Sequence, residues 1–289
     1  MKKLPFSYCY DWGVFDEKGR EVAMAEFAAN GARHLVLTST LIEMISGNPK
    51  LYLKLRQEAR DAGLTFVDSH MPFNFETDIA LPVEEWRPQM LARMKFNLEI
   101  IHDYGIDTCC FHICSRYFKE FTLERHLDAA RRSLEELLPV AEQLGVVICL
   151  ENIFQPCNTV DDVLTLISEF PSPCLGACFD IGHAHLMERG MNIPDCIVPS
   201  HWEGVCAVPW EHDVLDRMLP HIVNCHLHDN RGDLDTHTIP GMGTIDWTGV
   251  IAKLRSAPRI RNMQSEVIPV RRNGLPIRAV VESFNRILG

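Results

Sequence analysis

Few of the features that assign a sequence to a protein class at sight are present here. The 289 residues contain no run of about 18 apolar residues, which argues against a membrane-spanning helix. The two lysines at positions 2 and 3 precede no apolar run, so we expect no signal peptide and a cytoplasmic location. Basic residues are outnumbered, with 28 Lys and Arg against 39 Asp and Glu, and the net charge of −11 argues against a nucleic-acid partner.

The cysteines also lack the spacing of a metal knuckle or a redox pair. The sequence has eleven of them, an odd number, and no Cys-x-x-Cys pair. Most lie inside apolar runs, at positions 109, 110, 149, 174, 178 and 225. This distribution favours buried, reduced thiols of a cytoplasmic protein over a disulfide framework.

Short apolar runs alternate with longer amphipathic ones along most of the chain. The short runs predict buried parallel strands, at Phe6–Asp11, His34–Thr40, Thr65–His70, Thr108–Ile113, Val146–Glu151, Gly176–Asp180, Ile222–His228 and Asn262–Val267. The longer runs predict helices, at Arg20–Asn30, Asn48–Ala62, Glu84–Tyr104, Thr122–Leu144, Thr159–Phe170, Val214–Leu219, Trp247–Ser256 and Pro276–Leu288. Glycines directly follow several of these helices and indicate left-handed C-caps.

Eight strand–helix units in about 290 residues indicate an α/β protein of the (β/α)8 TIM barrel type. A doubly wound sheet is the alternative, and it is disfavoured because no Gly-x-Gly-x-x-Gly turn follows the first strand. No linker rich in Pro, Gly or Ser divides the chain, so we expect one domain spanning residues 1–289. The irregular segment Glu188–Pro220 predicts a long insertion that forms a lid or a wall of the pocket.

The active site of such a barrel lies at the carboxyl ends of its strands. Six consecutive predicted strands deliver a carboxylate or an imidazole to that end, namely His70, His112, Glu151, Asp180, His226 and Glu266. Buried carboxylates are costly unless they are paired, and a shared cation would neutralise them while using the imidazoles as ligands. The pattern therefore predicts a divalent-metal site.

Three further motifs stand near the predicted mouth. His183 follows Asp180 by three residues, and His228-Asp229 follows His226, so that His226 and His228 share one side of a strand. Asp235-Thr-His237 precedes a glycine-containing loop that ends in Asp246, which we expect to cap a helix starting at Trp247. Asp229 could serve as a ligand or cap the following loop. We also consider Asp68 as a group that holds the second nitrogen of a histidine ligand.

These motifs together resemble the xylose isomerase-like TIM barrel superfamily, which includes sugar and sugar-phosphate isomerases and epimerases and endonuclease IV. The resemblance rests on the segments 150–152, 180–183, 226–229, 235–237 and 240–243 and on Glu266, and it runs from the third to the eighth strand. In its ketose 3-epimerase members, one manganese, cobalt or magnesium ion is held at positions that match Glu151, Asp180, His226 and Glu266. In its endonuclease IV members, three zinc ions use positions that match His70, His112, Glu151, Asp180, His183, His226, Asp235, His237 and Glu266.

The resemblance implies a metal-dependent isomerase or epimerase of a small sugar, ketose, inosose or sugar phosphate. Glu151 and Glu266 would act as acid and base around a metal-stabilised enediolate, and His183 would contact the oxygen that gains charge. From position alone we expect His70, His112, Arg231 and Trp202 to contact substrate, with Trp210 and Phe73 as pocket walls.

A trinuclear-zinc phosphodiester hydrolase is the alternative, and a non-catalytic sugar-binding barrel is the third hypothesis. The ion would be manganese, zinc or cobalt, as one ion or as up to three zinc ions. The resemblance also implies a homodimer or homotetramer.

Overall fold

Eight parallel strands close into a barrel in this computed structural model, which describes residues 4–270 and 274–289. The strands are β1 (Phe6–Tyr8), β2 (His34–Leu37), β3 (Thr65–His70), β4 (Thr108–Phe111), β5 (Val147–Glu151), β6 (Leu175–Asp180), β7 (Ile222–Leu227) and β8 (Met263–Ser265). Each strand pairs with the next along the chain, and β1 pairs with β8 to close the ring, with Tyr8 opposite Ser265. The predicted (β/α)8 barrel is confirmed. Residues 1–3 of the expected domain lie outside the described residues.

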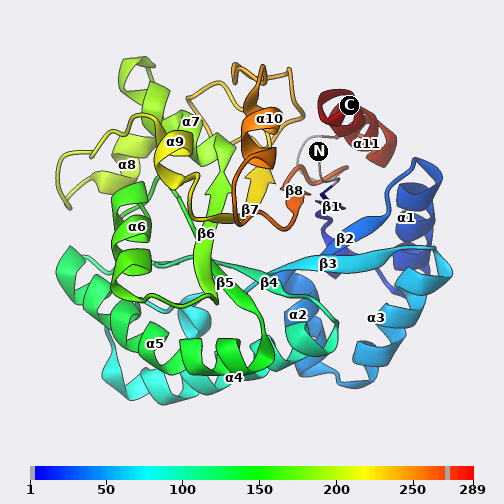
Figure 1. The fold of residues 1–289 in the computed structure, drawn as a ribbon, viewed down its shortest axis with the longest axis horizontal. Helices are drawn as coiled ribbons and strands as arrows, with labels where there is room; N and C mark the ends of the chain where they lie inside the picture. Colours follow the sequence, from blue (N-terminus) through cyan, green and yellow to red (C-terminus); the bar gives the residue numbers. More distant parts are fainter. Residues whose placement is uncertain (1–3, 271–273) are drawn as a thin grey trace.

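Helices form the outer layer around this ring (Figure 1). They are α1 (Glu17–Ala29), α2 (Ser39–Gly47), α3 (Lys50–Asp61), α4 (Arg87–Asp103), α5 (Leu123–Leu144), α6 (Val160–Glu169), α7 (Ile181–Arg189), α8 (Val198–Trp202), α9 (Val214–Met218), α10 (Val250–Arg255) and α11 (Ile277–Leu288). Local sequence fixes several ends. Thr122 accepts a hydrogen bond from the Arg125 N–H and begins α5, and Gly145, at φ 70°, ends it.

The structure corrects several predicted boundaries and adds the helices α2, α7 and α8. The strand expected to reach Thr40 ends at Leu37, because the Thr38 hydroxyl accepts from the Leu41 N–H and starts α2 there. Helix α7 likewise begins directly after β6, with Asp180 as its N-cap. The helix predicted to start at Trp247 begins later, since α10 starts at Val250 and Asp246 accepts from the Thr248 N–H in the preceding turn.

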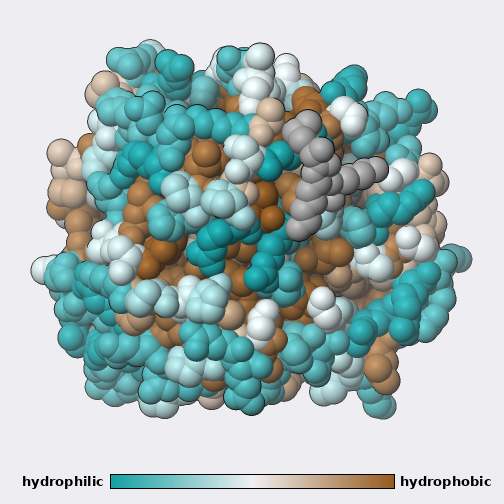
Figure 2. Space-filling model, in the orientation of Figure 1, coloured by the Kyte–Doolittle hydropathy of each residue, from teal (hydrophilic) through white to brown (hydrophobic). Residues whose placement is uncertain are grey.

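Two kinds of side chain fill the barrel. The layer between the strands and the helices is the main apolar core, and in a space-filling view hydrophilic residues cover most of the visible face around apolar patches (Figure 2). Inside the ring, residues alternate with outward-facing ones along each strand. This interior includes a small cluster of Cys110, Val147, Cys149, Cys178 and Val223. All eleven cysteines are unpaired, and nine of them are buried.

The insertion predicted at Glu188–Pro220 contains more regular structure than its sequence indicates. Helices α8 and α9 lie within it, and a second apolar cluster forms around Leu186, Met187, Val198 and Trp202. The cluster packs the insertion against the end of β5 through Ile153 and Phe154. No helix in the described part of the chain is both long and apolar enough to cross a membrane.

Candidate metal centre

The carboxyl ends of the strands surround a cavity of about 520 Å³. Its lining includes seven of the predicted site residues, namely His70, His112, Glu151, His183, Asp235, His237 and Glu266. Tyr10, Phe73, Ile153, Phe154 and Ile268 supply apolar wall. Among the lining residues that the structure describes, none is Lys or Arg. The cavity therefore combines clustered metal-type donors with apolar walls.

Glu151 lies at the centre of this arrangement and is 1% exposed. Its Oε1 is 3.0 Å from His226 Nδ1 and 3.5 Å from His183 Nδ1. Its Oε2 is 3.2 Å from His112 Nε2 and 3.6 Å from His70 Nε2. One carboxylate at the end of β5 thus faces four imidazoles, which come from β3, from β7, from the residue after β4 and from the first turn of α7.

A first group of donors combines Glu151, Asp180, His226 and Glu266. One ligand atom from each lies within 4.8 Å of the others. Asp180 and His226 are register partners on β6 and β7, which places them side by side. His226 Nδ1 is 3.1 Å from Glu266 Oε1 as well as 3.0 Å from Glu151 Oε1. This is the quartet that the sequence predicted as ligands of one ion.

A second group contains His183, His228, Asp235 and His237, again with ligand atoms within 4.8 Å. His237 Nε2 is 2.9 Å from Asp235 Oδ2, and His183 Nε2 is 3.8 Å from the same oxygen. The rings of His228 and His237 stack with centroids 3.8 Å apart. These residues come from α7 and from the segment that follows β7, so the fold unites segments about 50 residues apart.

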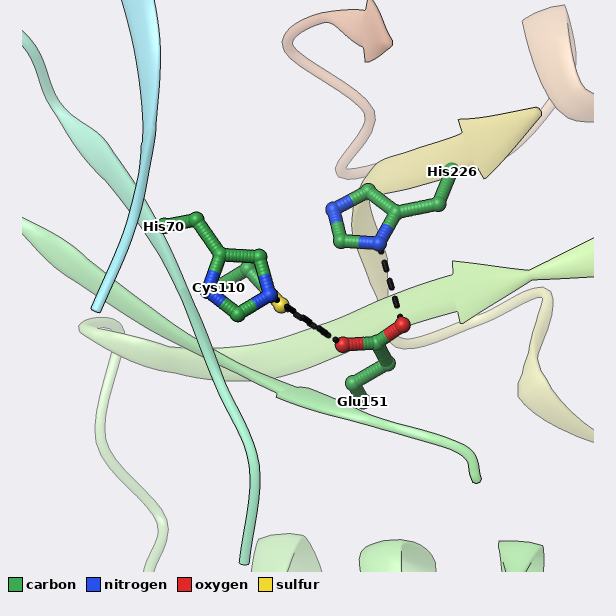
Figure 3. Close-up of side chains that lie close together, drawn as sticks. All are labelled: His70, Cys110, Glu151 and His226. Carbon is green, nitrogen blue, oxygen red and sulfur yellow. Dashed lines mark hydrogen bonds and ion pairs between the residues drawn. The ribbon is translucent and has the colours of Figure 1, made fainter. Parts of the chain in front are cut away.

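A third group contains His70, Cys110, Glu151 and His226, all buried (Figure 3). In Figure 3 the Glu151 carboxylate lies between the His226 imidazole on one side and His70 with Cys110 on the other. Sequence reasoning did not select Cys110 as a site residue. The signal was available, because Cys110 precedes His112 by two residues within the predicted strand Thr108–Ile113, where the two would share a face. In the structure His112 directly follows β4, which ends at Phe111.

The orientation of three imidazoles fits a metal ion. The Nδ1–H of His70 donates to the Met71 carbonyl at 2.8 Å, that of His183 to the Asn152 carbonyl at 3.1 Å, and that of His237 to the Glu266 carbonyl at 3.1 Å. A carbonyl only accepts, so in the neutral form of each ring Nε2 would carry the lone pair that a metal ligand needs. His237 Nε2 lies 2.9 Å from the Asp235 carboxylate and donates a proton to it, which a bound ion would displace. His226 Nε2 is buried and has no hydrogen-bond partner among the described residues. The donor set therefore suits a divalent cation.

Mutual pairing dominates the electrostatics of the site. Burial raises the pKa of Glu151, but His226, His112 and His183 outweigh this effect and hold the pKa well below its usual range. Burial lowers the pKa of His183, whereas Asp180, Asp235 and Glu151 raise it well above its usual range. Acids and imidazoles thus share protons here, and a cation would take the place of those protons.

Two asparagines that sequence reasoning did not select as site residues hold the strand ends in place. Asn152 pairs with Asp180 across β5 and β6, accepting from its N–H at 2.8 Å and donating to its carbonyl at 2.9 Å. Asn158 accepts from the N–H groups of Ile113 and Cys114, both at 3.0 Å, and so fixes the segment that follows His112. Their pairing across strands is invisible in a single sequence.

The histidine at position 228 is held by close packing as well as by hydrogen bonds. Its Nε2 is 3.1 Å from both carboxylate oxygens of Asp180. A Cβ on Gly182 would lie 1.9 Å from the ring, so only glycine fits beside it. Asp229 caps the following loop, because its carboxylate accepts from the Gly241 N–H at 2.8 Å and from the Trp247 indole N–H at 3.1 Å. Of the two roles that the sequence left open for Asp229, ligand or loop cap, the structure shows the cap.

Several residues expected near the substrate lie elsewhere. Trp202 does not line the cavity, because its ring is buried in the cluster of the insertion and its indole N–H donates to the Phe154 carbonyl at 2.9 Å. Trp210 packs against the same cluster, and Arg231 is exposed and outside the cavity lining. Phe73 does line the cavity and stacks on His112 at 4.6 Å.

Asp68 does not hold a histidine nitrogen as considered from the sequence. Its carboxylate accepts from the Thr108 hydroxyl at 2.7 Å, the Ser69 N–H at 2.9 Å and the Asn224 amide at 3.2 Å. These partners lie on β3, β4 and β7, so the group crosses the barrel interior. Asp68 is therefore part of a polar network among the strands and is not a support for a ligand.

Comparison with known proteins agrees with this barrel. The sequence pattern described as "Xylose isomerase-like TIM barrel" matches residues 24–262. The chain belongs to the xylose isomerase-like TIM barrel family. Among curated relatives, a probable endonuclease 4 of Mycoplasmopsis pulmonis is 26% identical over 125 residues, 42% of this chain and 41% of that protein. An uncharacterized protein of Methanocaldococcus jannaschii is 29% identical over 133 residues, 45% of this chain and 39% of that protein. The chain thus spans about two fifths of the length of these relatives.

Solved structures of this family superimpose on nearly the whole chain. An L-ribulose 3-epimerase has a TM-score of 0.70 at 12% identity and covers 99% of this chain and 95% of its own. The 3-keto-D-glucoside 4-epimerase of E. coli has a TM-score of 0.68 at 18% identity, with 99% of both chains covered. A Thermus thermophilus protein soaked with zinc chloride is 25% identical, with a TM-score of 0.61 over 92% of this chain and 93% of its own.

Proposed function

We propose that this member of the xylose isomerase-like TIM barrel family is a metal-dependent isomerase or epimerase of a small carbohydrate that bears a carbonyl group. One observation carries the proposal. The carboxylates of Glu151 and Glu266 meet at His226 Nδ1, at 3.0 and 3.1 Å, beside a cavity of about 520 Å³. Two carboxylates beside one pocket can remove a proton from carbon and return it.

The two acids come from different sides of the ring. Glu151 ends β5, and Glu266 follows β8, so they approach a bound sugar from separate directions. One carboxylate takes the proton from the carbon next to the carbonyl, and the other carboxylic acid delivers a proton to the opposite face or to the neighbouring carbon. His183, with its Nε2 toward the cavity residue Asp235, is placed to hydrogen-bond a sugar oxygen. Phe73 and Tyr10 cover apolar faces of the sugar ring or chain and exclude water.

Glu151, Asp180, His226 and Glu266 would hold the ion, and a divalent ion supplies Lewis acidity toward carbonyl and hydroxyl oxygens. Zinc, manganese and cobalt all accept carboxylate and imidazole ligands. The cavity wall that the structure describes carries no Lys or Arg. This favours a neutral sugar, ketose or inosose over a sugar phosphate. The reduced cysteines support a cytoplasmic location. A homodimer or homotetramer stays a prediction.

The test is hydrogen exchange at carbon. The purified protein with its metal is incubated in D₂O with a panel of ketoses, aldoses and inososes, and products are followed by NMR. We expect deuterium at the carbon next to the carbonyl together with a new epimer or isomer. Glu151→Gln and Glu266→Gln should each lower turnover about 10²–10⁴-fold while the fold is kept.

Glu135→Gln, an exposed position on α5, is the matched control and should retain full activity. Full activity in either cavity variant would exclude the two-carboxylate mechanism. Absence of exchange with every sugar of the panel would contradict the proposed reaction.

A phosphodiester hydrolase with three zinc ions is the second candidate, because the donors form three groups, two of which share Glu151 and His226. Metal analysis separates the two candidates: one equivalent per chain supports the sugar enzyme, and three equivalents of zinc support the hydrolase. Asp235→Ala should lower the metal content only in the second case. Abasic DNA and small phosphodiesters are the substrates to assay there.

A further inference from the structure

A buried sulfur atom that the proposed quartet of ligands does not use lies beside the cavity residue Glu151. Cys110 Sγ is 3.1 Å from Glu151 Oε2, and the residue is completely buried. Its direct register partner on β3 is His70, so the two side chains lie on adjacent strands at the same height. Together with His226 they offer one sulfur, one oxygen and two nitrogens within 4.8 Å of one another.

We propose that Cys110 is a thiolate ligand and that His70, Cys110, Glu151 and His226 bind a borderline-soft divalent ion such as zinc or cobalt (Figure 3). The inference rests on the metal dependence of the proposed function and is independent of the sugar substrate. Nothing in the ketose-type quartet requires a sulfur ligand, since its donors are three carboxylates and one imidazole.

The distances suit tetrahedral coordination. Zinc–sulfur bonds of about 2.3 Å and zinc–nitrogen or zinc–oxygen bonds of about 2.0 Å separate neighbouring ligand atoms by roughly 3.3–3.6 Å. Cys110 Sγ and His70 Nε2 lie 3.1 and 3.6 Å from Glu151 Oε2, and a ring nitrogen of His226 completes a group whose four ligand atoms lie within 4.8 Å of one another. Side-chain rotations that draw these atoms together would complete the site.

The second observation comes from the histidines. His226 is 0% exposed, and its Nε2 has no hydrogen-bond partner among the described residues. His70 donates its Nδ1–H to the Met71 carbonyl, which leaves Nε2 directed at the Glu151 carboxylate beside Cys110. The thiol donates its hydrogen to Glu151, so ion binding replaces that shared hydrogen. A metal–sulfur bond forms, the S–H bond breaks, and one proton leaves to the buffer.

Sulfur in this position determines which ion is bound. Thiolate ligands favour zinc and other softer ions, whereas magnesium and manganese prefer oxygen. The chain therefore selects zinc or cobalt over magnesium at this group. The neighbouring Cys109 serves as a matched control, because it belongs to the main apolar core on the other side of β4.

The experiment is cobalt(II) titration of chelator-treated protein, for wild type, Cys110→Ser and Cys109→Ser. Wild type and Cys109→Ser should show a near-ultraviolet sulfur-to-cobalt charge-transfer band, and Cys110→Ser should lose that band and keep the visible cobalt bands. Zinc affinity, measured against a chromophoric chelator, should fall about tenfold or more in Cys110→Ser only. X-ray absorption of the zinc-loaded wild type should show a zinc–sulfur distance of about 2.3 Å, which needs no variant.

Visible cobalt bands without the sulfur band in wild type, or persistence of the sulfur band in Cys110→Ser, would overturn the inference and leave the proposed function standing. Absence of any cobalt binding would remove the metal site on which both proposals rest. A sulfur band in a protein that exchanges no sugar hydrogen would leave the thiolate ligand in place and refute only the sugar reaction.

Discussion

Replacing Gly182 with alanine tests the packing that holds His228 against Asp180. The new methyl carbon would lie 1.9 Å from His228 Cε1 and 2.5 Å from Nε2, whereas ordinary contacts begin near 3.4 Å. The His228 ring must therefore move by about 1.5 Å to relieve this overlap. The ring is 0% exposed and has no open space beside it, so the movement disturbs its packed neighbours. That displacement breaks the 3.1 Å hydrogen bonds from His228 Nε2 to the Asp180 carboxylate.

The expected loss follows from two costs and one gain. Overpacking a core costs about 1–3 kcal/mol, and a lost hydrogen bond to a charged group costs about 1.5–3 kcal/mol. Alanine regains up to about 1 kcal/mol of helix propensity, because Gly182 lies in the first turn of α7. We expect Gly182→Ala to lower the free energy of unfolding by roughly 2–5 kcal/mol.

Urea unfolding of the metal-free protein measures this loss without a contribution from bound ions. Gly47→Ala is the control, because Gly47 ends α2, has an ordinary φ, and would place its Cβ at least 4 Å from any other group. The control should change stability by no more than about 1 kcal/mol, as a gain, because alanine has the higher helix propensity. A similarly small change in Gly182→Ala would refute the argument that His228 is fixed by close packing.

Three further changes test other parts of the structure. Asn158→Ala should cost about 3–5 kcal/mol in urea unfolding, because its buried side chain makes four hydrogen bonds to backbone groups around positions 113–114 and 156. Burial raises the pKa of Asp78 to about 7, although three backbone N–H groups donate to its carboxylate and lower the pKa. The folded state therefore holds the Asp78 proton more tightly than the unfolded chain does. Stability should therefore fall by up to about 4 kcal/mol as pH rises from about 4 to 7, and unfolding curves of Asp78→Asn should lack that component. Trp202→Phe should lose about 1 kcal/mol of stability with unchanged kcat/KM, and a large loss of kcat/KM would restore Trp202 to the substrate site.

The sequence predicted those site residues whose position follows from the fold class alone, namely the residues at the carboxyl ends of the strands. A parallel barrel brings every carboxyl strand end to one mouth, so a carboxylate or imidazole at that position is enough to place His70, Glu151 or Asp180. Helices α2 and α7 were missed because each starts directly after a strand, with no glycine or loop between, and their apolar residues continue the run of the strand.

Contacts between segments that are distant in the sequence could not be read from it. Asn152 pairs with Asp180, and a side chain at position 182 would overlap the His228 ring. Both contacts depend on the strand register, which a single sequence does not show. The position of Trp202 was predicted wrongly, because an irregular insertion has no periodic pattern that shows which way a side chain points. An apolar ring of this kind fits a pocket wall or a buried cluster equally well, and in the structure it lies in the cluster. Cys110 was assigned to the core because a cysteine in an apolar run is usually a packed thiol.

Glu151 belongs to two donor groups, so the binding of an ion at one group is thermodynamically linked to binding at the other. Its two oxygens face different donor groups, so ions at two groups would share one negative charge. Each ion must then change the affinity for the other by the same factor, whichever binds first. A titration of the wild type would not be the sum of independent sites, and removing this one carboxylate would alter the occupancy of both groups together.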